Sequence, residues 1–410
     1  MRAVIRRTAD FTGFRPDRFT VLCLERRNFE RDIEQLRMRT RCNWLGLRSR
    51  VLGPALWAFI PQEFRKQTDY FACRVPEAEA AFSAAGAFVA ELLAEMARRH
   101  RLDAVMSANT DYWQDESLKR ACARLGLPFL VLSREYYNTE AKVEWKQQRY
   151  EESGFRFEGA GVAVFGPKML ATLTSGGVCP PDRIWITGPP RLDVWRDGPG
   201  AEPKDTLTLL SFARKIYLAT GVFESMLDAF ARFSLRPEAR GIRCVVKGKN
   251  RADSDNVRRM LSEIPNRLIV TDGMDIAALF RRSRVIAGFN SLAILEGLLT
   301  SAAVCCPAWG DAARDPAEML IDPGAPDAAR AVSFVRSPEE FTQLLVAAAE
   351  GRLPASDAGA RLRLVREHFH YPEEGTCSGE VERFVVEASA RFRAGRAGAA
   401  PDSGPARDAG

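Results

Sequence analysis

Residues 284–310, RVIAGFNSLAILEGLLTSAAVCCPAWG, decide the fold of this chain. The stretch predicts a strand at 284–288, a sharp glycine-containing turn, a helix, and a second strand at 303–306. Asn290 and Ser291 fall where a helix N-cap is expected. The helix therefore begins directly after a strand, where its unpaired backbone N–H groups and positive dipole end suit a phosphate.

Further residues of this stretch suit the rest of a nucleotide. Gly288 lies at the turn, and we predict that it binds phosphate together with Asn290 and Ser291. Glu296 projects a carboxylate from the first turns of the same helix, which is poor for phosphate and good for a ribose diol. The pattern indicates a nucleotide-diphosphate site. The alternative is a plain βαβ unit in which Asn290 and Ser291 only cap a helix.

Bulk properties narrow the class of protein. At 410 residues the chain fits two domains of ordinary size, with the hydrophobic (46%) and charged (27%) content of a globular protein. The net charge is +6 and no long Lys/Arg run is present, so nucleic acid is not an expected partner. Anionic substrates or an anionic membrane surface fit the charge equally well.

The cysteine and histidine contents bear on metals and compartment. Nine cysteines are scattered without a CxxC pair, and there are three histidines in all, so a zinc site is not expected. Cys305 and Cys306 lie in a predicted buried strand. Reduced cysteines, no apolar signal-peptide core and no apolar run near ~20 residues together favour the cytoplasm.

Strands alternate with helices along both halves, which predicts parallel sheets. The first half is expected to hold strands at 19–24, 103–107, 128–132, 161–165 and 183–187. The second half is expected to hold strands at 207–212, 242–247, 268–271, 285–288, 303–306 and 332–335. The fold class is therefore α/β, with two Rossmann-like, doubly wound parallel-sheet domains facing a cleft. The expected division is a first domain at 1–188, a linker at 189–204, a second domain at 205–378, a C-terminal helix at 379–393 and a disordered tail at 394–410.

Basic residues follow the strands of the second half at their carboxyl ends. Ligands of doubly wound sheets bind at that edge. Four cations, together with the N-terminus of the predicted helix, are expected to converge there as a diphosphate requires: Arg214, Lys215, Lys247 and Lys249. Solvated loop-tip cations are the alternative for each residue alone.

Three stretches resemble a known family in their order and spacing. They are FGPKMLATLTSGGVCPPDRIWITGPPRLD at 165–193, CVVKGKN at 244–250, and GFNSLAILEGLLTSAAVCCPAWGD at 288–311. The combination resembles nucleotide-sugar glycosyltransferases of the two-Rossmann-domain (GT-B) type, in particular bacterial surface-polysaccharide enzymes and CDP-glycerol glycerophosphotransferases. Two elements depart from the family pattern: Lys249-Asn250 replaces His-Pro, and residues 301–303 replace Gly-Lys-Pro.

The resemblance implies roles for individual residues. The second domain would bind the nucleotide and the first the acceptor, without a metal or a cofactor. Asn290 and Ser291 would hold phosphate, Glu296 the ribose, and Lys247 and Arg214 the developing negative charge.

The acceptor hydroxyl would need a general base from the first domain. Glu135, in the loop after the strand at 128–132, is the first candidate, and Asp111, after the strand at 103–107, is the second. Each could instead be a solvated loop carboxylate or a helix cap.

Residues 37–60, RMRTRCNWLGLRSRVLGPALWAFI, mix arginines with tryptophans and leucines. Such a segment suits contact with anionic lipid headgroups, which a lipid-linked acceptor would make useful. The alternative is two buried apolar turns with solvated arginines, because Gly53-Pro54 breaks any single long helix.

The sequence therefore predicts a cytoplasmic GT-B glycosyltransferase, in peripheral contact with the inner membrane if residues 37–60 bind lipid. It would move a sugar from a nucleotide-diphosphate donor onto a surface polysaccharide of the capsule or lipopolysaccharide type. A nucleotide-sugar 2-epimerase would share the architecture but would need more acidic and histidine side chains in the cleft. Two alternatives stay open. One is a transferase of glycerol phosphate or polyol phosphate from a CDP donor. The other is a non-catalytic nucleotide-binding scaffold, favoured by the two altered motif elements.

Overall fold

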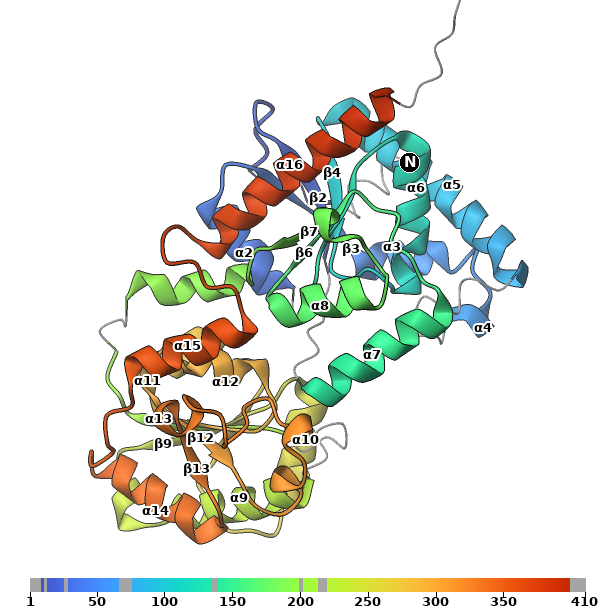
Figure 1. Ribbon diagram of the computed structural model, residues 1–410. Coiled ribbons are helices and arrows are strands. Elements are labelled where there is room, and N and C mark those ends of the chain that lie inside the picture. Colours follow the sequence, from blue (N-terminus) through green and yellow to red (C-terminus); the bar gives the residue numbers. More distant parts are fainter. Residues whose placement is uncertain are drawn as a thin grey trace, which may run out of the picture. The chain divides into compact units, whose positions relative to one another are not determined.

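The computed structural model describes residues 9–10, 13–25, 29–65, 76–134, 139–198, 202–212 and 220–398. The chain divides into two compact units (Figure 1). Unit 1 comprises residues 1–136, 147–191 and 372–410, and unit 2 comprises residues 137–146 and 192–371. One division point falls inside helix α7 (Glu140–Ser153), so the first turns of this helix belong to unit 2.

Unit 1 is built on a seven-stranded sheet in the order β1-β3-β2-β4-β5-β6-β7. The short β1 is antiparallel to β3, and every other pair is parallel. Its strands are β1 (Ala9–Asp10), β2 (Thr20–Glu25), β3 (Asn43–Arg48), β4 (Ala104–Ser107), β5 (Phe129–Leu132), β6 (Gly161–Val164) and β7 (Ile184–Ile186). Strands β4, β5 and β6 are buried throughout, as a sheet with helices on both faces requires.

The helices of unit 1 follow the strands as a doubly wound fold requires. They are α2 (Glu30–Arg39), α3 (Ser49–Leu56), α4 (Gln62–Arg65), α5 (Pro76–Arg99), α6 (Glu116–Leu125), α8 (Pro167–Ser175) and α16 (Cys377–Gly398), with short 3-10 turns η2 (Trp113–Asp115) and η3 (Pro181–Arg183). Helix α6 ends at Gly126 in the left-handed conformation (φ 64°), as its sequence predicts.

Helix α5 corrects one expectation. Among the described residues it is the one helix long and apolar enough to cross a membrane by length and composition, with a mean hydropathy of 1.4 over its best window. The expectation that no stretch approaches such a length was therefore wrong. The helix buries one face, including Phe82 and Leu93, in unit 1, and the Phe82 ring packs edge-on against Trp113 at 6.2 Å.

Unit 2 is built on a six-stranded parallel sheet in the order β10-β9-β8-β11-β12-β13. Its strands are β8 (Thr206–Leu210), β9 (Arg243–Lys247), β10 (Ile269–Thr271), β11 (Ser283–Ala287), β12 (Ala303–Pro307) and β13 (Val332–Val335). Numbered within the unit, this is the 3-2-1-4-5-6 order of a Rossmann fold. The prediction of two doubly wound, Rossmann-like domains is confirmed.

The main helices of unit 2 are α9 (Thr220–Phe233), α10 (Arg251–Met260), α11 (Ile276–Arg282), α12 (Leu292–Gly297), α13 (Ala328–Ala331), α14 (Pro338–Ala349) and α15 (Ala358–His368). Short 3-10 segments are η4 (Pro190–Asp197), η6 (Pro237–Ala239), η7 (Gly310–Ala313) and η8 (Pro316–Glu318). Helices α9 and α14 lie side by side, and rings of Phe230 and Phe341 meet between them (Figure 1). Phe212 packs against Phe223 of α9 and against Phe289, joining the ends of β8 and β11 to the core.

The C-terminal helix and the expected linker differ from the predicted domain organisation. The C-terminal helix α16 runs to Gly398, so residues 394–398 are helical rather than part of a disordered tail, while 399–410 lie outside the described residues. Helix α16 packs on β5, β6 and α2 of unit 1. The expected linker at 189–204 is partly ordered, since it contains η4.

The segment at 37–60 is also different from the expectation. Its apolar residues Trp44, Leu45 and Leu47 are core residues of β3, not a lipid-facing surface or two apolar turns. Alternation fails to identify this strand because both of its faces are buried. Trp57 and Phe59 are the exposed aromatic side chains of the segment, and nothing in the structure supports a membrane contact there.

Candidate functional site

The predicted nucleotide site lies at the topological switch point of unit 2. Strands β8 and β11 are neighbours in the sheet, and the chain leaves them toward opposite edges. Crevices between the carboxyl ends of two such strands are where doubly wound folds bind ligands. The β11 end leads through Gly288 into Asn290 and Ser291, and the β8 end leads through Ser211 and Phe212.

The turn after β11 has a defined conformation. Asn290 is the one non-glycine residue with positive φ (49°) in the described part of the chain. Its side-chain Nδ2 donates to the Glu318 carbonyl at 2.6 Å, and its Oδ1 accepts from the Leu320 N–H at 2.7 Å. Ser291 is the N-cap of α12, where its Oγ accepts from the Ala293 N–H at 3.3 Å. The side chain of Asn290 thus braces the turn.

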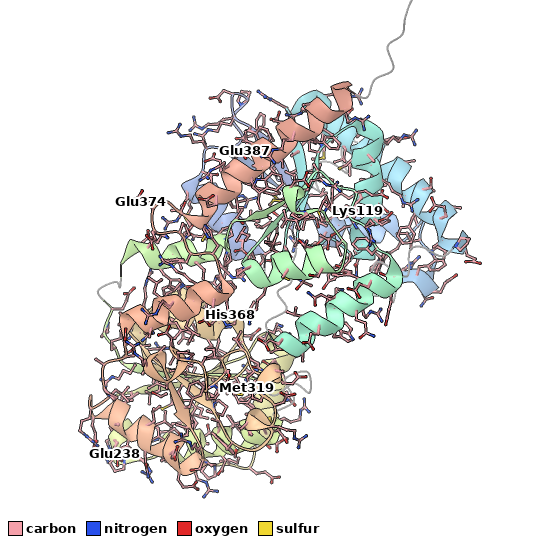
Figure 2. The ribbon with its side chains drawn as sticks, in the orientation of Figure 1. Lys119, Glu238, Met319, His368, Glu374 and Glu387 are labelled. Atoms are coloured by element: carbon pink, nitrogen blue, oxygen red, sulfur yellow. The ribbon has the colours of Figure 1, made fainter. Side chains whose placement is uncertain are left out.

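Gly288 and Glu296 are both buried beside this turn. A Cβ built on Gly288 would lie 3.0 Å from Leu210 Cβ and 3.1 Å from Ile294 Cδ1, so the missing side chain allows α12 to pack on β8. Glu296 is 4% exposed in α12. The sequence pattern predicted that Glu296 lies on this helix, but it could not show that the side chain is buried. Met319, labelled in Figure 2, is likewise buried in the loop that Asn290 braces.

The β9 end of the same edge carries Lys247 and Lys249. Lys247 Nζ donates to the carbonyls of Gly248 and Asp272, each at 3.0 Å, so this lysine ties the β9 and β10 ends together. The backbone N–H of Lys249 donates to Asp253 Oδ2 at 2.8 Å, while its side chain is exposed.

Buried Asp253 fixes this loop. It accepts from Ser211 Oγ at 3.0 Å, and its N–H donates to the N-cap Asn250 Oδ1 at 3.0 Å. The beginning of α10 is therefore locked to the end of β8.

A further cation reaches this edge that the sequence did not indicate. Lys142, in the first turns of α7, belongs to unit 2. Burial lowers the pKa of Lys142 below its usual value, Lys249 lowers it further, and Glu318 acts in the opposite direction. Lys142, Lys249 and Glu318 thus interact beside the turn that Asn290 braces. No local pattern in 139–146 marks Lys142, because only the fold brings α7 here.

Three predicted site residues fall outside the described residues: Arg214, Lys215 and Glu135. They follow β8 and β5, and the structure gives no account of them.

In unit 1 the switch point lies between β2 and β4, since β3 and β5 extend the sheet in opposite directions. Asp111 follows β4 at that point and is 3% exposed. Its Oδ2 accepts a hydrogen bond from the Tyr150 hydroxyl at 3.3 Å. Asp111 is therefore a buried, oriented carboxylate rather than a solvated loop residue.

Beside Asp111 lies a group of polar atoms that sequence reasoning missed. Both side-chain polar atoms of Asn109 are buried and have no hydrogen-bond partner among the described residues, and the same holds for Trp113 Nε1 and Ser117 Oγ. Each such atom costs about 1–3 kcal/mol unless a ligand or water satisfies it. The polar run SANTDYWQDES at 107–117 was the available signal. Lys119, labelled in Figure 2, donates to the Thr110 carbonyl at 2.6 Å and fixes the far side of this loop.

Metal ligands do not gather in the parts of the chain described here: no cluster of three or more His, Cys, Asp or Glu side chains that could hold a metal is found among them. The eight cysteines within those parts are all free and buried.

No family model matches this sequence, and no curated protein matches it. Solved structures do match. A UDP-N-acetylglucosamine 2-epimerase has a TM-score of 0.51 and 13% identity, covering 97% of this chain and 100% of that chain. A Listeria monocytogenes protein described provisionally as a UDP-N-acetylglucosamine 2-epimerase has a TM-score of 0.53 and 11% identity, covering 92% and 97%. A glycosyltransferase from Rickettsia africae has a TM-score of 0.46 and 13% identity, covering 92% and 99%.

At such low identities the likeness establishes the fold. The chain has the two-domain, Rossmann-like fold of the GT-B type, with a candidate ligand edge on each unit.

Proposed function

We propose that this protein is a cytoplasmic glycosyltransferase that moves a sugar from a nucleotide-diphosphate donor to a surface-polysaccharide acceptor. The observation that carries the proposal is the switch point of unit 2. There the Rossmann strand order, the braced Asn290 turn and the half-buried start of α12 coincide with Lys142 and Lys249.

The donor site would work by electrostatics. The backbone N–H groups that follow Ser291 and the ammonium groups of Lys142 and Lys249 would stabilise the departing diphosphate. An anion placed between two neighbouring cations favours the charged form of both, so a diphosphate would relieve the electrostatic repulsion between these lysines. The carboxylate of Glu296 would accept from the ribose hydroxyls once the nucleotide displaces its neighbours.

The acceptor would bind at the switch point of unit 1. The unsatisfied amide of Asn109 offers a donor and an acceptor to a sugar hydroxyl. Asp111, oriented by Tyr150, is a candidate general base for that hydroxyl, and Glu135 remains the other. Either carboxylate would take the proton as the hydroxyl oxygen attacks the anomeric carbon.

A non-catalytic nucleotide-binding scaffold is the second candidate. It is favoured by one observation, namely that the side chains of Asn290 and Lys247 are committed to backbone groups of unit 2. A CDP-glycerol or polyol-phosphate transferase would use the same donor edge.

The deciding experiment titrates UDP, CDP, their sugar conjugates and CDP-glycerol by calorimetry, and then follows label transfer from the best donor to glycan and lipid-linked acceptors. We expect one nucleotide sugar to bind and to be turned over. Asn109→Ala should lower transfer about tenfold with donor affinity unchanged, because one polar contact is lost on the other unit. Donor binding without any turnover would favour the scaffold, turnover of CDP-glycerol the polyol-phosphate transferase, and conversion of the donor to its C2 epimer would refute the transferase.

A further inference from the structure

A cavity lies in unit 2 at the edge of the sheet opposite the switch point. Its volume is about 140 Å³, and it is lined by Trp195, Gly198, Lys204, Arg281, Leu299, Thr300 and Ser301. Lys204 precedes β8, Arg281 precedes β11 and Ser301 precedes β12, so the cavity is at the amino ends of these parallel strands. The described residues predicted to bind the nucleotide donor lie at the opposite, carboxyl edge of the sheet and do not line this cavity.

Two residues that line this cavity carry buried N–H groups without an acceptor among the residues that the structure describes. Trp195 is 9% exposed, and its Nε1 is buried without a partner. Arg281 Nε is also buried without a partner, although its Nη2 donates to the Val194 carbonyl at 3.0 Å. A buried N–H without an acceptor is costly and points to an absent ligand or water.

The donors are held in place rather than mobile. The Trp195 ring stacks on Phe280 at 6.3 Å with an interplanar angle of 19°, and the Arg281 guanidinium lies 5.9 Å from the Trp195 ring centroid. The Lys204 carbonyl accepts from Arg284 Nε at 2.5 Å, which anchors the backbone beside the cavity. A ligand would therefore meet a preformed set of donors.

The charge of the cavity is positive. Two of its lining residues, Lys204 and Arg281, are cations, and none of the described residues that line it is acidic. Behind the wall formed by residues 299–301, the buried Arg361 donates to the carbonyls of Gly297, Leu298 and Ala302. Burial first, and then Arg361, lowers the pKa of Lys204, whereas Glu202 acts in the opposite direction. An anion would offset this excess of positive charge.

A larger cavity in unit 1, of about 240 Å³, has acidic as well as basic lining residues. It is lined by Glu116 and Glu158 as well as by basic residues, and Glu116 is bonded to Arg120 at 2.9 Å. Its basic lining residues are Lys119, Arg120, Arg156 and Arg396, so its lining carries both signs of charge. The cavity at Trp195 and Lys204 differs from it in having no acidic side chain among its described lining residues.

We propose that the cavity lined by Trp195, Lys204 and Arg281 binds a single phosphate-type oxyanion, held by the indole N–H, the ammonium and the guanidinium. At about 140 Å³ it is smaller than the roughly 300–1,000 Å³ of ordinary ligand pockets, so a whole nucleotide does not fit. The anion is either free, as inorganic phosphate or diphosphate, or the phosphate group of a larger molecule such as a phospholipid. This site is independent of the proposed transferase activity.

The test follows the tryptophan indole ¹H–¹⁵N resonances of the full chain while inorganic phosphate is added. The resonance missing from Trp195→Phe identifies Trp195, and this variant keeps a ring against Phe280. We expect that resonance alone to shift downfield and to saturate. Lys204→Ala should weaken the phosphate affinity about tenfold, because a charged hydrogen bond is lost, whereas the matched control Lys168→Ala should not change it. If Trp195→Phe fails to fold, the resonance that Lys204→Ala perturbs most is taken as Trp195.

Parallel titrations distinguish the sources of the anion. Diphosphate and a soluble short-chain phosphatidic acid are each added in place of phosphate. Saturation by phosphate or diphosphate alone identifies a free anion, and tighter binding of the phosphatidic acid identifies a phosphate group on a lipid. The proposal is overturned if the Trp195 resonance does not move, if chloride shifts it equally at the same ionic strength, or if Lys204→Ala leaves the affinity unchanged.

Discussion

Asn290 and Leu320 are joined by a hydrogen bond of 2.7 Å from the Leu320 N–H to Asn290 Oδ1, across 30 residues of sequence. The amide nitrogen of the same side chain donates to the Glu318 carbonyl at 2.6 Å. Together the two bonds hold Asn290 at φ 49°, a conformation that asparagine tolerates better than other residues with a Cβ. They fix the exit of β11, and with it the direction in which α12 begins.

The first prediction concerns this brace. Asn290→Ala should lower the free energy of unfolding by about 2–4 kcal/mol, because it removes two buried hydrogen bonds and places alanine at positive φ. Asn290→Gly is the matched control, since it removes the bonds and tolerates the backbone conformation, and it should cost less. Denaturant unfolding measures both. Equal stability of Asn290→Ala and the unaltered protein would show that the brace does not stabilise the turn.

The second prediction concerns Glu296. Glu296→Gln keeps the volume of this buried side chain and removes its charge, so the protein should fold. It should lose most of the thermal shift given by the preferred nucleotide, because a hydrogen bond to a charged group contributes about 1.5–3 kcal/mol. Glu296→Ala should also lose the shift, at a greater cost in stability.

A control nucleotide tests the same assignment. The unaltered protein should prefer the ribonucleotide to its 2′-deoxy analogue, and Glu296→Gln should discriminate less between them. An unchanged shift in the variant would remove the ribose assignment.

The third prediction concerns the buried ion pair in unit 1 between Asp32 and Arg191. Arg191 Nη1 lies 2.8 Å from Asp32 Oδ2, with side-chain exposures of 10% and 0%. Asp32→Asn should lower the free energy of unfolding of unit 1 by about 3–5 kcal/mol, because it leaves a guanidinium buried without its counter-ion. The exposed pair Arg232–Asp228 supplies the control, and Asp228→Asn should cost less than about 1 kcal/mol. Equal costs for the two substitutions, measured by denaturant unfolding, would contradict the prediction.

The fourth prediction concerns thiol reactivity. Burial raises the pKa of Cys244 and of Cys306 to about 12 and that of Cys179 to about 11. The thiolate is the reactive form, so at about pH 8 these groups should be inert in the native protein. Of the nine cysteines, eight are buried and Cys73 lies outside the described residues. Native protein should therefore take up at most one equivalent of a thiol reagent, and unfolded protein all nine. Two or more fast equivalents in the native state would contradict the burial.

Much of the architecture was predictable from local pattern. Apolar runs, helix caps and glycine stops act within a few residues, so they can be recognised from the sequence. They located the strand at 303–306 and the helix at 167–175. Strand β3 was missed because Trp44, Leu45 and Leu47 are buried on both faces and show no alternation. The end of α16 was missed because Ala, Gly and Arg resemble a tail in composition, although the helix continues through them.

The candidate sites divide in the same way. Sequence order by itself determined that Asn290 and Ser291 follow a strand and that Ser291 caps a helix, since both depend on neighbours in the chain. Only the tertiary structure decided that Lys249 acts on the charge of Lys142 and that Trp195 and Lys204 line one cavity. It also decided that Asn109 is buried beside Asp111 without a hydrogen-bond partner among the described residues. These groups meet because parallel strands bring distant loops to one edge of a sheet, and the burial that sets their chemistry depends on all the layers packed around them.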